Sequence, residues 1–205
     1  MTNELKVVSL KKNKNNYVVL LSDGTEIEAN EDLILKYRLV EKHILDEDDL
    51  NKIKDDSLYF KLYDKSLNYL SKNSTSKGKM LDYLINKGAS LDLANKIVNE
   101  LENRKLLDDR KYMQALCSHY IRAGYGKLYI LNIAYKYKIE KSIANNALAE
   151  IDEEEFINSC ICVGKKKVKT LNKYDEYNKK NKLIIYLQNR GFEYDVINQC
   201  LKEIL

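Results

Sequence analysis

The sequence predicts a mainly helical protein: an elongated array of three tandem three-helix repeats, preceded by a small N-terminal α+β unit with a β-hairpin. Three observations predict this fold class. The 205 residues include no proline and only 7 glycines, so helices meet few interruptions. Hydrophobic residues make up 44% and charged residues 32%, a balance typical of a packed globular chain. Beyond residue 57, apolar residues recur at helical spacing.

The first 57 residues differ from the rest because they combine β-prone runs with a hairpin signal. Asp23-Gly24 lies between two such runs, and both residue types tolerate the positive φ that a tight hairpin turn requires. Asn30 is the expected N-cap of the first helix. The predicted elements, in chain order, are strands at 7–10, 17–21 and 26–29 and short helices at 31–39 and 46–53.

The remaining residues repeat one helical pattern three times. The windows 80–101, 130–151 and 183–204 align with apolar residues at equivalent positions. Two unrelated amphipathic hairpins can also align, but the windows at 130 and 183 each follow a further predicted helix, at 109–122 and 153–163, which favours a true repeat. Stacking such modules joins their apolar faces into one long core. The predicted domains are 1–57, 58–107, 108–152 and 153–205.

Membrane and export classes are excluded by the pattern. No stretch approaches the roughly 18 to 20 apolar residues of a membrane helix, and Met1–Leu10 has no apolar segment of an export signal. The cysteines have the spacing of neither a zinc site nor a redox motif, so buried or half-buried thiols are expected at Cys117, Cys160, Cys162 and Cys200. We therefore expect a cytoplasmic monomer.

No catalytic group is predicted. The two histidines, His43 and His119, lie in unrelated contexts and cannot form a metal cluster. Cys117-Ser118-His119 are consecutive on a predicted helix, so their side chains point about 100° apart and cannot align as a catalytic triad. Gly124-Tyr125-Gly126-Lys127 lacks the length of a phosphate-binding loop. We expect no catalytic residue, no cofactor and no metal.

Charge is divided unevenly along the chain. Residues 1–57 hold 9 Lys and Arg against 13 Asp and Glu, a net charge of −4, whereas residues 58–205 carry 26 against 18, a net of +8. The longest basic run contains Lys165, Lys166, Lys167 and Lys169, with tyrosines following it. Bases interleaved with aromatic rings suit nucleic-acid contact, and a solvated helix face is the alternative.

A second candidate contact lies in the segment 122–127. Its two glycines allow a partner to approach the backbone, while Arg122, Tyr125 and Lys127 supply charge and an aromatic ring. The alternative is an ordinary turn between helices, with Gly126 ahead of the next helix.

Three ordered motifs resemble the RecX regulators of the RecA recombinase. They are Leu106-Leu107-Asp108-Asp109-Arg110-Lys111-Tyr112, then Gly124-Tyr125-Gly126, then Arg190-Gly191-Phe192-Glu193-Tyr194-Asp195-Val196-Ile197. The resemblance implies three repeats of three helices, no enzymatic activity and binding to the RecA filament on single-stranded DNA. It also implies inhibition of ATP hydrolysis, strand exchange and coprotease activity, and so modulation of DNA repair and the SOS response.

Two positions depart from the family pattern. Tyr137-Lys138-Ile139 replaces a Lys-Gly-Ile helix ending, so Lys138 must accept a left-handed backbone at about 1 kcal/mol or more, or the helix ends differently. Tyr125 stands where a basic residue is usual, which weakens a direct phosphate contact there.

The main hypothesis is a non-enzymatic negative modulator of a recombinase filament. Its alternatives are a stand-alone helical DNA-binding protein, with possible direct DNA contact, and a purely protein-binding solenoid with solvated bases. Whether inhibition works by end-capping or by groove binding stays open. The candidate partner- or DNA-binding residues are Arg122, Tyr125, Lys127, Lys165, Lys166, Lys167, Lys169 and Arg190.

Overall fold

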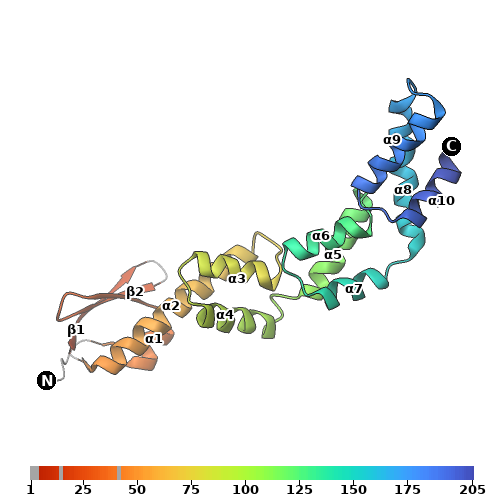
Figure 1. The fold of residues 1–205 in the computed structure, drawn as a ribbon. Coiled ribbons are helices and arrows are strands. Elements are labelled where there is room, and N and C mark those ends of the chain that lie inside the picture. Colours follow the sequence, from red (N-terminus) through yellow and green to blue (C-terminus); the bar gives the residue numbers. More distant parts are fainter. Residues whose placement is uncertain (1–4, 14–15, 41–42) are drawn as a thin grey trace. The chain divides into compact units, whose positions relative to one another are not determined.

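The computed structural model describes residues 5–13, 16–40 and 43–205 (Figure 1). Within this part there are ten α-helices and a small N-terminal antiparallel sheet, and nine of the helices follow its last strand; this confirms the predicted fold class. The chain forms two compact units. The first comprises the described residues up to Asn73 with Leu81–Glu100, and the second comprises Ser74–Met80 with Leu101–Leu205. Among the described helices, none is both long and apolar enough to cross a membrane.

The N-terminal sheet has four strands in the order β3-β2-β1-β4. The predicted hairpin turn forms, and Gly24 takes a φ of 86° in it. Strand β1 is longer than predicted, because pairing with β2 supplies hydrogen-bond partners that outweigh the low β propensity of its Lys and Asn residues. The sequence did not predict β4. The strands are β1 (Leu5–Asn13), β2 (Asn16–Leu21), β3 (Glu26–Ala29) and β4 (Ile44–Leu45).

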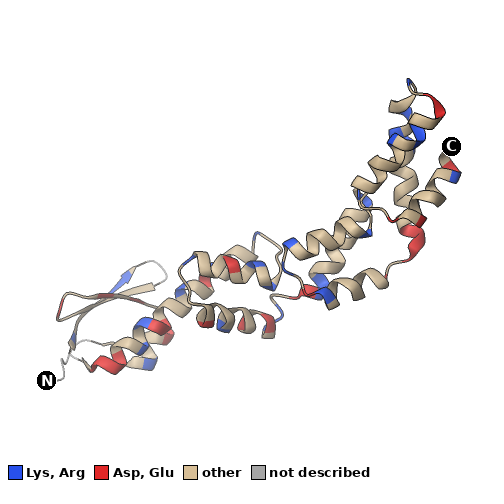
Figure 2. Ribbon diagram, in the orientation of Figure 1, with Lys and Arg blue, Asp and Glu red and all other residues tan. Residues whose placement is uncertain are grey.

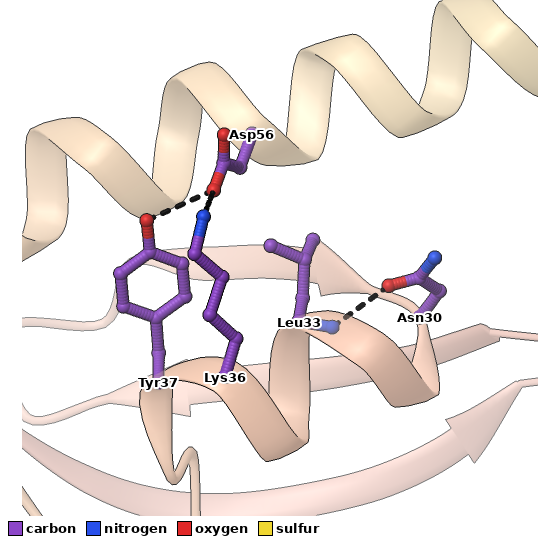
Figure 3. A network of polar contacts seen from close by, with 5 residues as sticks. All are labelled: Asn30, Leu33, Lys36, Tyr37 and Asp56. Carbon is purple, nitrogen blue, oxygen red and sulfur yellow. Dashed lines mark hydrogen bonds and ion pairs between the residues drawn. The ribbon is translucent and has the colours of Figure 1, made fainter.

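Helix α1 (Glu31–Tyr37) begins where it was predicted and is held by polar contacts at both ends (Figure 3). Asn30 Oδ1 accepts a hydrogen bond of 2.9 Å from Leu33 N, as expected of an N-cap. Lys36 Nζ and Tyr37 Oη both donate to Asp56 Oδ2, at 2.5 and 2.9 Å. These contacts join α1 to the following helix.

Helix α2 (Glu47–Leu70) is one continuous helix where we predicted two. The expected break lies in the polar stretch around Asp56 and Ser57, but the tertiary structure uses these residues. Asp56 receives the two bonds from α1, and Ser57 Oγ donates to the Glu28 carbonyl of β3. With their polar groups satisfied and no Gly or Pro present, the helix continues. The proposed boundary between residues 57 and 58 falls inside it, and the division into modules stays a proposal.

The later helices bury the aligned apolar positions. Met80, Ile130 and Leu183 are all fully buried. The remaining elements are α3 (Lys77–Asn86), α4 (Leu91–Asn103), α5 (Asp109–Arg122), α6 (Lys127–Lys136), α7 (Lys141–Ala149), α8 (Glu153–Val168), a short 3₁₀ turn (Lys169–Leu171), α9 (Glu176–Asn189) and α10 (Tyr194–Ile204).

The sequence left open how the helix before Lys138 ends, and in the structure this helix is α6. Lys138 adopts a left-handed backbone with a φ of 55°, while Gly88 and Gly191, at the equivalent positions after α3 and α9, have φ of 95° and 78°. The three helices therefore end in the same way. The left-handed conformation costs lysine about 1 kcal/mol, a cost that glycine avoids because it has no Cβ.

Asp109 connects the start of α5 to the start of α3. Its Oδ1 accepts a 2.8 Å hydrogen bond from Lys77 N, and its side chain is buried. Burial raises the pKa of Asp109 above its usual 3.8. At neutral pH the ionised carboxylate of Asp109 therefore lowers the stability of the folded state.

We expect Asp109→Asn to raise the free energy of unfolding at pH 7, since the amide oxygen can still accept from Lys77 N. The native state binds a proton on Asp109 more tightly than the unfolded state does. The wild type therefore regains stability as the pH falls through the raised pKa of Asp109 towards the usual 3.8. The difference between variant and wild type should shrink over that window in urea titrations at pH 7, 5 and 4. A constant difference would contradict this account.

The cysteines are free thiols with unequal access. Cys117, Cys160 and Cys200 are buried as predicted, whereas Cys162 is exposed. Burial raises the pKa of Cys117 to about 11. The hydrogen bond to Cys200, together with burial, raises the pKa of Cys160. We expect a thiol reagent at pH 7.5 to modify Cys162 alone in the folded protein and all four cysteines in urea, as mass spectrometry would show.

Candidate partner-binding surface

The predicted lysine run lies at the end of α8, where Figure 2 shows blue ribbon segments. Lysines in the last turn of a helix are stabilised by the partial negative charge of its carbonyl end. Lys167 is half-buried, whereas Lys165, Lys166 and Lys169 are exposed to solvent. We call these three residues the α8 lysines. They offer positive charge that a partner can reach.

The second predicted site, the turn between α5 and α6, is more ordered than its sequence indicates. Arg122 donates from Nε to the Ser118 carbonyl of its own helix at 2.9 Å. Gly124 has a φ of 80°, and Tyr125 N donates to the Tyr120 carbonyl at 2.9 Å. Gly126 is the N-cap of α6. The chain reverses here within a few residues.

This turn packs directly against the turn between α9 and α10. Gly126 N donates to the Arg190 carbonyl at 2.8 Å, and Leu128 N donates to the Gly191 carbonyl at 3.0 Å. Two amides at the start of α6 thereby gain partners that the helix itself cannot provide. A Cβ on Gly126 would lie 2.3 Å from the Gly191 oxygen, so this close approach requires glycine.

Arg190 joins the two turns through its side chain. Its Nη1 donates to the carbonyls of Ala123, at 3.1 Å, and Gly124, at 2.9 Å. Its guanidinium carbon lies 4.9 Å from the centre of the Tyr125 ring and 5.1 Å from that of Tyr186. Both distances are those of cation–π contacts. Arg190 is therefore engaged within the protein.

Tyr186 connects this arrangement to the lysine run. Lys167 Nζ lies 5.1 Å from the centre of the Tyr186 ring, the same ring that Arg190 approaches. The structure thus brings together three predicted residues from separate parts of the sequence: Tyr125, Lys167 and Arg190. Lys127 pairs with another residue of the α9–α10 turn, its Nζ lying 3.9 Å from Glu193 Oε2.

Sequence reasoning missed the tyrosine cluster formed by Tyr120, Tyr125 and Tyr129. The rings of Tyr125 and Tyr129 stack with centres 4.0 Å apart, and Tyr120 lies 5.8 and 5.4 Å from them. The four-residue spacing of Tyr125 and Tyr129 was an available signal, although it spans a turn. Burial raises the pKa of Tyr120, so its phenol is neutral at physiological pH. The cluster supplies rigid aromatic surface rather than charge.

The arrangement is suited to non-covalent contact. The residues that the structure describes contain no group of three or more His, Cys, Asp or Glu side chains that could hold a metal ion. What the surface offers is charge on the α8 lysines and flat rings held by packing. Both serve electrostatic and stacking interactions with a partner.

Comparison with known proteins gives consistent matches. A family model described as "RecX, third three-helix domain" matches residues 153–201, which include α8 and α9 and most of α10. Regulatory protein RecX of Clostridioides difficile (strain 630) is 24% identical over 201 residues, covering 98% of this chain and 94% of that protein. Regulatory protein RecX of Finegoldia magna is 30% identical over 186 residues, covering 85% and 89%.

Two solved structures share the fold. One, described as the crystal structure of regulatory protein RecX, has a TM-score of 0.80 at 21% identity and covers 97% of this chain and 99% of its own. RecX from Lactobacillus salivarius has a TM-score of 0.68 at 24% identity and covers 72% and 96%. The two curated relatives and the first of these structures are named regulatory proteins. Given the likeness to the Finegoldia magna protein over most of both sequences, the chain belongs to the RecX family of regulatory proteins.

Proposed function

We propose that this protein is a non-enzymatic regulator that binds the RecA filament on single-stranded DNA and inhibits its recombinase, ATPase and coprotease activities. By doing so it would modulate DNA repair and the SOS response. The observation that carries the proposal is membership of the RecX family, with a likeness that extends over nearly the whole chain. We further propose that it acts as a monomer.

The charges support a filament as partner. A filament on DNA presents repeated phosphates and protein faces, and the α8 lysines can meet anionic groups there. Helical modules that contact successive protomers add their weak contacts through effective concentration. Contacts that are individually weak can then give firm binding.

The direct test is to add the purified protein to RecA on single-stranded DNA and follow ATP hydrolysis. We expect the rate to fall as the protein concentration rises, at concentrations where binding to the same DNA without RecA is weak. Fluorescence anisotropy of labelled DNA measures the second quantity. Unchanged hydrolysis at saturating protein would refute the proposal.

A stand-alone DNA-binding protein is the second candidate, and the exposure of the α8 lysines favours it. It requires tight binding to naked DNA with a steep salt dependence, because released counterions drive such association. The anisotropy experiment at several salt concentrations therefore separates the two functions.

A further inference from the structure

The two turns that contain Gly126 and Gly191 form a junction that occurs twice in the second compact unit. In the first copy, Ser76 Oγ at the start of α3 donates to the Tyr137 carbonyl, and a Cβ on Gly78 would lie 2.4 Å from Lys138 Cβ. In the second copy, Gly126 N at the start of α6 donates to the Arg190 carbonyl. The start of one helix thus packs in both cases on the left-handed turn that ends another.

The two junctions differ in the donor, a serine hydroxyl in the first and a backbone amide in the second, and in the side chains around it. Tyr137, which aligns with Arg190, packs edge-on against Tyr112 with ring centres 5.9 Å apart. Arg190 instead crosses the junction and donates to two consecutive carbonyls of the opposite turn. Since the first junction forms without an arginine, Arg190 adds a connection that packing a helix start on a left-handed turn does not require.

The surroundings of Gly124 show how closely α8 and Arg190 pack on the turn between α5 and α6. A Cβ there would lie 2.2 Å from Val163 Cγ1 and 3.1 Å from Arg190 Nη1, so helix α8 and the guanidinium both close on the same turn. Val163 precedes Lys165 and Lys166 by less than one helical turn and Lys169 by less than two. The contacts that hold this turn therefore also define where the end of α8 lies.

We propose that Arg190 is a positioning residue, which fixes α8, α9 and α10 against the α5–α6 turn and so sets the direction in which the α8 lysines face a partner. The effect on inhibition rests on the proposed function, whereas the structural effect does not. Lysine is a poor replacement for Arg190. Both hydrogen bonds come from Nη1, which an ammonium could imitate, but a compact ammonium lacks the planar guanidinium whose carbon lies 4.9 and 5.1 Å from the Tyr125 and Tyr186 ring centres.

The structural test measures the distance between α5 and α10. Spin labels are attached in the full chain through Ala115→Cys and Gln199→Cys, both at exposed positions, with Cys162→Ser removing the exposed native thiol. We expect a narrow distribution of distances between the labels in the protein that keeps Arg190, and a broader one in the variants Arg190→Ala and Arg190→Lys. The matched control is Arg122→Ala, which removes an arginine that bonds only within its own helix and should leave the distribution narrow.

The functional readout is inhibition of RecA-driven ATP hydrolysis by the same variants without labels. We expect the half-inhibitory concentration of Arg190→Ala to rise about tenfold, or 1.4 kcal/mol. If Arg190→Ala fails to fold, as judged by circular dichroism, Arg190→Lys carries the test. An unchanged distribution with weaker inhibition would make Arg190 a direct contact and overturn the proposal.

Two further outcomes decide the rest. A broader distribution with unchanged inhibition would overturn the link to function. If even the wild type leaves RecA unaffected, the proposed function fails and that link falls with it, while the distance distributions still decide whether Arg190 positions the helices.

Discussion

Replacing the three α8 lysines with glutamate, in the triple variant Lys165→Glu, Lys166→Glu and Lys169→Glu, is expected to abolish the slowing of RecA-driven ATP hydrolysis. The substitutions change the formal net charge from +4 to −2 and put repulsion where attraction is proposed. We expect the half-inhibitory concentration to rise about a hundredfold. Lys167 is left unchanged because it packs over Tyr186, so the variant should keep its helicity.

The matched control replaces three other exposed lysines of the second compact unit with glutamate: Lys111, Lys136 and Lys141. It changes the net charge equally but leaves the end of α8 intact. We expect it to retain most of its inhibition. If both triple variants lose inhibition equally, total charge is responsible and the α8 lysines are no specific surface. Full inhibition by the α8 variant would remove these lysines from the mechanism.

The second large effect is expected from Gly126→Ala. The new methyl group would lie 2.3 Å from the Gly191 oxygen and 2.5 Å from Phe192 Cα, and both are backbone atoms that cannot rotate away. Separating the turns would also weaken the bonds from Gly126 N and Leu128 N to the opposite carbonyls. We expect the free energy of unfolding to fall by about 3 kcal/mol or more, from overpacking and lost hydrogen bonds.

Urea unfolding followed by circular dichroism measures this loss. Gly88→Ala serves as the comparison, because a Cβ on Gly88 meets no atom within 4 Å and the variant bears only the cost of a left-handed alanine, with a φ of 95°. That cost is about 1 kcal/mol. Equal losses in the two variants would show that the junction tolerates the methyl group.

Features that depend on neighbouring residues were predictable from the sequence. Asn30 begins a helix because its short side chain accepts from a backbone amide three residues later. At Lys138 the sequence left two alternatives, a left-handed backbone or a different helix end, and the structure shows the first, with a φ of 55°. The helix predicted at 153–163 is longer in the structure: α8 continues to Val168, so that Lys165 and Lys166 lie in its last turn and Lys169 is its C-cap. The function assigned to them stays a proposal.

Other features depended on contacts across the chain. The sequence predicted a break near Ser57, yet α2 continues, since its polar side chains bond to α1 and β3. Arg190 was grouped with the lysine run as a partner contact, which stays a prediction. The structure adds that its Nη1 donates to carbonyls 66 and 67 residues away.

By itself, the sequence determined where α1, α5 and α8 begin and that Met80, Ile130 and Leu183 are buried, because capping and apolar periodicity act over a few residues. It did not determine where α2 and α8 end. Only the tertiary structure decided that Tyr125 and Arg190 meet. The physical reason is that bringing together residues far apart in the sequence costs chain entropy, and the packing of whole helices offsets this cost. No local pattern records which turns that packing places side by side.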